Sequence, residues 1–166
     1  MKKWLIRICL ILGIMLCGCS GGEDFEVIAD SLVDSPKPEP AKMVLTLPSD
    51  VTLSVMEGSD WECYEGEHYQ IILQTCPSGS LDQTLQLVTG YSKEQLNVME
   101  ISATNVDKYF CAWSSVSEAG EVVGRCTILD DGMYHYCLSI LIDAEVSGEV
   151  RDTINAVFAT YSLEGY

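Results

Sequence analysis

The chain has 166 residues, of which 48% are hydrophobic, and its 25 acidic and 9 basic side chains give a net charge of −16 at pH 7. This charge repels nucleic acid and anionic lipid headgroups, and it excludes nucleic acid as a partner. The length and the hydrophobic content suit a single globular domain with its own core.

The first nineteen residues have the pattern of a bacterial export signal. Three basic side chains lie within the first seven residues, and an apolar stretch follows over residues 8–16. This stretch is shorter than the roughly 20 apolar residues that a membrane span requires. Residues 16–19, with the sequence LCGC, resemble the lipobox of bacterial lipoproteins, although Cys17 replaces the smaller residue that is common there. The resemblance implies cleavage after residue 18 and lipidation of Cys19; the alternative is an ordinary cleaved signal peptide.

Removal of residues 1–18 leaves six basic and 25 acidic side chains, a balance of −19. Residues 19–41 are predicted to be the lipidated cysteine and a flexible tether, because glycines and acidic residues lead into alternating prolines that favour an extended chain. Residues 42–166 are predicted to form one globular domain, since roughly 125 residues are enough for a single core. We expect the tether to separate this domain from the membrane.

The first half of the predicted domain combines strands with a helix. Ser80 and Gln83 have the spacing of a capping box, which predicts a helix that ends at Gly90. Ser92 and Gln95 repeat the spacing and predict a shorter helical turn. Four segments before them have strand patterns, and the last two of these are expected to pair as a hairpin. The segments are residues 43–47, 51–56, 61–64 and 69–73.

The second half predicts an antiparallel meander that is followed by a helix. Asp131-Gly132 lies between two apolar segments and is a strong signal for a two-residue hairpin loop. Ser147 is predicted to cap a helix whose apolar stripe, from Val150 to Phe158, packs on the sheet. Residues 161–163 are expected to form a last short strand. The strands of the meander are predicted over residues 98–104, 108–115, 121–129 and 133–142.

This order of elements predicts an α+β fold, in which two or three helices pack on an antiparallel sheet of about six to seven strands. The same order, on the body of a small lipoprotein, is similar to that of the PsbP-like superfamily. The resemblance covers residues 42–166 and rests on the order of elements. It implies a role in binding or assembly without catalysis, and it transfers no functional residue to this chain.

The cysteines are candidate functional residues. A two-residue loop at Asp131-Gly132 would place Cys126 opposite Cys137, with His135 on the same face and Cys111 on the preceding strand. Cysteine and histidine are zinc ligands, but the tight spacing of most zinc sites is missing. A Cys126–Cys137 disulfide is a second possibility, and buried free thiols are the preferred one, because free cysteine is among the most buried residue types. The sequence does not determine the pairing of Cys63, Cys76, Cys111, Cys126 and Cys137.

An acidic segment around Trp61 and Tyr64 is a candidate binding surface. A cationic peptide or a sugar ring stacked on Trp61 would suit carboxylates placed beside aromatic rings. The segment equally suits an exposed hairpin with inward-packed aromatics, and its spacing does not match a calcium-binding loop. Its charged neighbours are Glu57, Asp60, Glu62, Glu65, Glu67 and His68.

The sequence predicts a membrane-anchored extracytoplasmic lipoprotein that binds or scaffolds without catalysis. Its two histidines leave little scope for acid–base catalysis. We expect it to contact the membrane through lipidated Cys19, to bind an envelope or secreted protein or a glycan, and to need no cofactor or metal. The alternative is a small envelope enzyme, or a metal or redox protein, that uses the face with Cys126, His135 and Cys137.

Overall fold

The computed structural model describes residues 39–54, 61–117 and 120–166. Pro40–Tyr166 form one compact unit. The predicted signal peptide, Cys19 and the predicted tether up to residue 38 lie outside the described residues. None of the helices in the described part of the chain is long and apolar enough to span a membrane.

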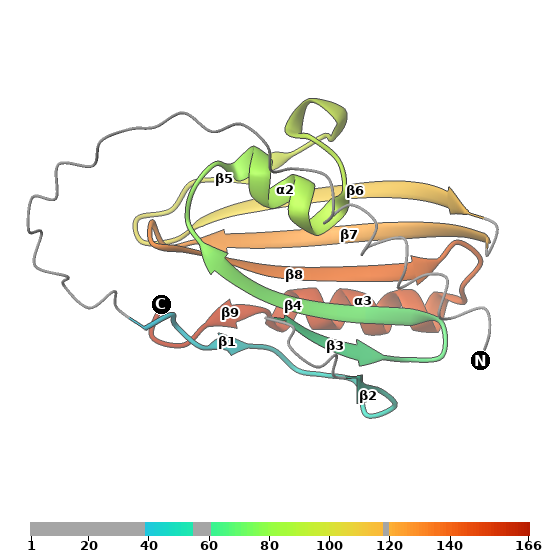
Figure 1. Ribbon diagram of the computed structural model, residues 1–166. Helices are drawn as coiled ribbons and strands as arrows, with labels where there is room; N and C mark the ends of the chain where they lie inside the picture. The colour runs from blue at the N-terminus through green and yellow to red at the C-terminus, as the bar shows by residue number, and fades with distance from the viewer. Residues whose placement is uncertain (1–38, 55–60, 118–119) are drawn as a thin grey trace, which may run out of the picture. The chain divides into compact units, whose positions relative to one another are not determined.

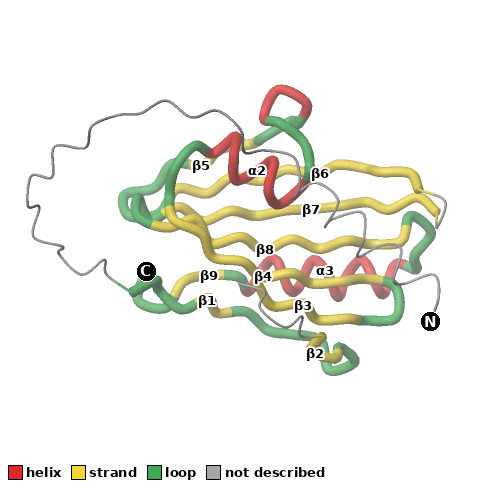
Figure 2. Tube along the Cα trace, viewed as in Figure 1, coloured by secondary structure: helices red, strands yellow, loops and turns green. Residues whose placement is uncertain are grey.

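A seven-stranded antiparallel sheet lies at the centre of this unit (Figures 1 and 2). Its strands follow the order β2-β3-β4-β8-β7-β6-β5, so β8 joins the first hairpin to the meander. Two α-helices accompany the sheet in the described part of the chain, which confirms the predicted α+β class. The strands of the large sheet are Thr52–Ser54 (β2), Trp61–Glu65 (β3), Tyr69–Pro77 (β4), Met99–Ile101 (β5), Asp107–Ser117 (β6), Gly120–Asp130 (β7) and Tyr134–Asp143 (β8). A separate pair is formed by Met43–Val44 (β1) and Ser162–Leu163 (β9).

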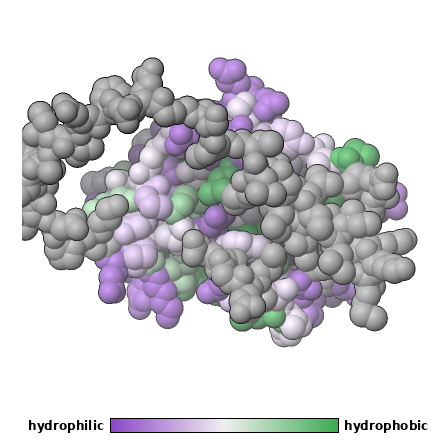
Figure 3. Space-filling model, viewed as in Figure 1, coloured by the Kyte–Doolittle hydropathy of each residue, from purple (hydrophilic) through white to green (hydrophobic). Residues whose placement is uncertain are grey.

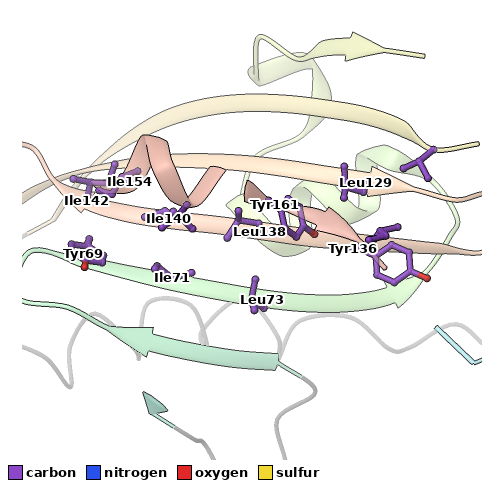
Figure 4. Close-up of a cluster of buried hydrophobic side chains, with 13 residues drawn as sticks. Tyr69, Ile71, Leu73, Leu129, Tyr136, Leu138, Ile140, Ile142, Ile154 and Tyr161 are labelled. Carbon is purple, nitrogen blue, oxygen red and sulfur yellow. The ribbon is translucent and has the colours of Figure 1, made fainter. Parts of the chain in front are cut away.

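Helix α3, Gly148–Thr160, covers one face of the large sheet. As predicted, Ser147 begins it, and the Ser147 Oγ accepts a hydrogen bond from the Val150 amide at 3.3 Å. Ile154 and Val157 of the helix are completely buried against aliphatic and tyrosine side chains of β4 and β8. Figure 4 shows these side chains, which come from alternate strand positions because successive residues of a strand point to opposite faces. The group on the sheet includes Tyr69, Ile71, Leu73, Tyr136, Leu138, Ile140 and Ile142.

Helix α2, Leu81–Thr89, covers part of the opposite face and is followed by the 3₁₀ turn η1, Lys93–Gln95. Gly90 ends α2 with a φ of 81°, a left-handed conformation that favours glycine. The Ser80 side chain makes no cap hydrogen bond, so the predicted capping box is wrong there, whereas the one at Ser92 and Gln95 is confirmed. On the face of the described residues that is visible in Figure 3, hydrophobic residues are interspersed with hydrophilic ones.

The turn between β7 and β8 lies one residue later than predicted. Asp130 faces His135, which shifts Cys126 from a position opposite Cys137 to one opposite Ser139. The Asp131 Oδ1 causes the shift, because it accepts hydrogen bonds from the amides of Met133 at 2.9 Å and Tyr134 at 2.8 Å. Such a side-chain bond competes with the backbone bond that closes a two-residue loop. Because the turn moves by one residue, the partner of each β7 residue on β8 moves by two positions. A shift of two keeps every side chain on its predicted face.

Candidate functional site

A polar cluster lies at the end of the sheet, below the first turn of α2. Strand β4 supplies Cys76, which pairs directly with His135 of β8, and His135 in turn pairs with Asp130 of β7. Ser78 follows β4, and Thr84 projects from α2. We call Cys76, Ser78, Thr84, Asp130 and His135 the Cys76–His135 cluster.

Both ring nitrogens of His135 have hydrogen-bond partners, although the residue is only 1% exposed. Its Nδ1 lies 2.7 Å from the Thr84 Oγ1, and its Nε2 lies 3.2 Å from the Asp130 Oδ2 and 3.4 Å from the Ser78 Oγ. The Ser78 hydroxyl also donates to the Asp130 Oδ1 at 3.2 Å. An imidazolium needs an acceptor at each nitrogen, and the Thr84 hydroxyl and the Asp130 carboxylate supply them. The arrangement therefore suits a protonated His135.

The Cys76 thiol lies beside this histidine. The Sγ is 3.9 Å from the carbonyl oxygen of His135 and 4.0 Å from the Thr84 Oγ1. A hydrogen bond from the Cys137 thiol, supported by others from His135 and Thr84 and opposed by burial, lowers the pKa of Cys76 from 9.0 to about 5. The interaction with Cys76, together with the Asp130 carboxylate and against burial, raises the pKa of His135 above 6.5. These shifts favour a thiolate beside an imidazolium at mildly acidic pH, above the pKa of Cys76 and below that of His135.

The other described cysteines are also free, but they are buried. Burial raises the pKa of Cys63 to about 11, and interaction with Cys76 together with burial raises the pKa of Cys137 well above 9.0. Cys111 lies directly opposite Cys126 under α2. The preferred expectation of free thiols is therefore met, and the alternative Cys126–Cys137 bridge is absent because Cys126 lies opposite Ser139. Among the described residues no group of three or more histidine, cysteine or acidic side chains is arranged to hold a metal ion.

The sequence pointed to the correct face of the sheet but to the wrong thiol. Cys126, His135 and Cys137 do share the face under α2, as predicted from their spacing. The thiol next to the histidine, however, is Cys76, which the sequence hypothesis did not select. A helix signal that begins four residues after Cys76 was the available clue, because it brings the helix over the end of that strand.

Trp61 and Tyr64 do not point to the same side of β3. Trp61 lies opposite Gln74 and shares the face that carries α2, whereas Tyr64 lies opposite Ile71 and packs on the α3 side. The Tyr64 hydroxyl donates to the Glu62 Oε2 at 2.8 Å. The acidic residues Glu57 and Asp60 of this predicted surface lie outside the described residues.

A more exposed apolar surface lies on β5 and β6, on the same side as α3. Met99 is 64% exposed and Ile101 is 56% exposed. Met99 lies directly opposite the half-buried Phe110, and the exposed Ala112 follows on the same side of β6. We call Met99, Ile101, Phe110 and Ala112 the β5–β6 patch. Strand β5 is also the last strand of the large sheet, so one row of its backbone groups faces away from β6.

Comparison with known proteins identifies the fold and no family. No protein-family model and no curated protein matches the chain. Its structure is similar to that of LpqN from Mycobacterium tuberculosis, a protein involved in cell envelope biogenesis, with 8% identity and a TM-score of 0.51 over 78% of this chain and 87% of LpqN. A protein from Bacteroides thetaiotaomicron VPI-5482 matches 75% of this chain with 12% identity and a TM-score of 0.49, and this chain spans 46% of its length. At such identities the likeness to LpqN shows a shared fold alone.

Proposed function

We propose that the chain is an exported lipoprotein, anchored through Cys19 to the outside of the cell membrane, whose domain binds an envelope protein without catalysis. Three observations support this proposal. The residues before Cys19 resemble a lipobox, the fold is shared with an envelope-biogenesis protein, and the β5–β6 patch exposes large apolar side chains. The PsbP-like resemblance points to the same kind of role.

The β5–β6 patch is the observation that carries the binding proposal. Exposed apolar side chains that adjoin the edge of a sheet suit an extended segment of a partner protein, which adds as a further strand and places side chains on the apolar surface. The acidic character of the chain favours a neutral or basic segment. A glycan can form fewer hydrogen bonds with the outward-facing amide and carbonyl groups of β5 than an added peptide strand can. We therefore infer a protein partner.

Site-specific crosslinking tests the binding surface. A photoreactive residue at Met99, in the full chain expressed in a bacterial host, is expected to form a covalent adduct with an envelope protein. The same residue at the exposed position Ala156 of α3 is the matched control. An adduct at both positions, or at neither, would contradict the proposal. A third probe is placed at Trp61, and adducts from this position instead of Met99 would move the binding surface to the β3 hairpin.

Cell fractionation tests the anchor separately. The substitution Cys19→Ala removes the residue that the lipobox resemblance identifies as the acylation site. The variant is expected to leave the membrane fraction or to accumulate with an uncleaved signal peptide, whereas Cys17→Ala is expected to remain membrane-bound. Membrane attachment of Cys19→Ala after cleavage of the signal peptide would remove the lipoprotein assignment and leave the binding surface untouched.

A further inference from the structure

We propose that Cys76 is a thiol-modification site, at which a small disulfide compound forms a mixed disulfide with the chain. The inference does not rest on the proposed binding function. It rests on the placement of one accessible thiol between a buried histidine, a threonine hydroxyl and a second thiol.

Accessibility separates Cys76 from the other thiols. Of the five cysteines in the described part of the chain, Cys76 is the only one that is not buried. It lies near the end of β4, where the chain leaves the sheet to enter α2. The neighbouring Cys137 is 1% exposed and Cys126 is 3% exposed. A reagent in solution therefore meets Cys76 first.

The groups that face Cys76 stabilise its thiolate. Strand β8 presents His135 and Cys137, and β7 contributes Asp130 behind the imidazole. Helix α2 presents the uncharged Thr84. A thiolate is the reactive form of cysteine, and a neighbouring imidazolium is a known means of stabilising it. The lowered pKa of Cys76 agrees with this geometry.

The exchange itself needs no additional oxidant. The Cys76 thiolate attacks one sulfur of the disulfide compound, the original sulfur–sulfur bond breaks, and the second sulfur leaves as a thiolate that takes a proton from water. One disulfide is consumed and one is formed. Cys137 is the nearest thiol for a second exchange, but it is 1% exposed, and burial disfavours its reactive thiolate even after Cys76 has lost its charge. The mixed disulfide on Cys76 is therefore the stable product.

Oxidised glutathione is a suitable probe. The full-length chain, extracted from membranes in detergent, is incubated with the probe at pH 6 and then digested. Cleavage at Glu65 and Glu67 separates Cys63 from Cys76, so the modified residue is identified by mass. Among the five cysteines that the structure describes, we expect one adduct, on Cys76, and none with Cys76→Ser. An unmodified folded chain, equal modification of Cys63, or an internal Cys76–Cys137 disulfide without an adduct would each overturn the proposal.

The rate of alkylation by iodoacetamide measures the thiolate directly. At pH 6 we expect Cys76 to react roughly 100-fold faster than Cys63, after allowance for the lower intrinsic nucleophilicity of a thiolate with a low pKa. The rate should reach half its maximum near the pKa of about 5. A midpoint at the ordinary value for free cysteine, near 8.5, would contradict a stabilised thiolate.

The substitution Asp130→Asn tests how the cluster is held. The amide keeps the shape of the side chain but loses the charge that supports the imidazolium, so the midpoint of the Cys76 profile should move to higher pH. The control is Asp107→Asn, which changes an acid directly opposite Asp130 on β6. Asp130 is a positioning residue in this scheme, and Asp130→Glu is expected to restore part of the effect. Identical profiles for both asparagine variants would remove Asp130 from the scheme.

Discussion

The two faces of the large sheet use the same alternation of side chains for different kinds of interior. On the α3 side, aliphatic and tyrosine side chains form a continuous apolar core with Ile154 and Val157. On the α2 side, a shorter helix covers free thiols. At the edge of this face lies the Cys76–His135 cluster, in which the histidine has four polar or thiol neighbours. The first face is a conventional source of stability, since burial of apolar area is the main favourable term in folding. The second buries groups that need partners, and so it combines packing with chemistry.

The largest difference between the faces should appear on truncation of the α3 core. Ile140 is completely buried, and Ile140→Ala should lower the free energy of unfolding by about 2–5 kcal/mol. Denaturant titration measures the change. Val116→Ala, at a residue that is 81% exposed, is the control and should change the free energy by less than about 0.5 kcal/mol. A small loss for Ile140→Ala would mean that the α3 face is not the main core.

On the α2 face, a smaller loss is expected from an added methyl group. A Cβ at Gly124 would lie 2.1 Å from the Cε2 of Trp113, whose indole covers the glycine. Gly124→Ala should therefore displace the ring and cost about 1–3 kcal/mol. Thermal unfolding together with tryptophan emission measures both effects. The control is Gly79→Ala, where nothing lies within 4 Å of the added atom. Equal melting temperatures for the two variants would contradict the packing of Trp113 on Gly124.

The polar atoms at the edge of the α3 core allow a third comparison. The buried Tyr136 donates from its hydroxyl to the Asp131 Oδ2 and accepts from the Ala41 amide, both at 2.8 Å. Tyr136→Phe removes both hydrogen bonds and should cost about 1–1.5 kcal/mol. Denaturant titration is the measurement, and Tyr166→Phe, at an exposed residue, is the control. An unchanged free energy of unfolding in Tyr136→Phe would mean that water in the unfolded chain satisfies the hydroxyl as well as Asp131 and Ala41 do in the folded chain.

Local sequence patterns were sufficient for the α3 side and insufficient for the cluster. The apolar stripe of α3 and its cap at Ser147 are local and were confirmed. The turn at Asp131 was misplaced because a side-chain hydrogen bond chose between two loops of similar length. Cys76 was missed because its contact with His135 joins strands almost 60 residues apart, a register that no local pattern encodes.

The candidate surface at Trp61 and Tyr64 shows a different limit. The two residues are three positions apart, and the period of two in a strand already assigns them to opposite faces. Their grouping by composition alone ignored this geometry. The exposure of Met99 and Ile101 depends instead on how far α3 extends over the sheet, which is a property of the tertiary packing and was not predicted.

The smallest expected effect is a pH dependence of stability that arises from the α2 face alone. In the unfolded chain Cys76 and His135 have ordinary pKa values, so between pH 5 and about 6.5 that pair binds two protons. In the folded chain the pair binds one over this range, because the pKa of Cys76 is lowered to about 5 and that of His135 is raised. The unfolded state binds more protons, and the folded state therefore gains stability as the pH rises across this window.

Substitution of the thiol should remove this gain. We expect the stability of the wild-type chain relative to Cys76→Ser to increase by about 1 kcal/mol or less from pH 5 to pH 6.5, a value discounted for the partial exposure of the thiol. Denaturant titrations of both chains across this range measure the difference, and Cys63→Ser is the control, since a raised pKa leaves Cys63 protonated throughout. Parallel curves for the wild type and Cys76→Ser would mean that the thiol titrates alike in both states. The α2 face would then be a second packing surface rather than a site of thiol chemistry.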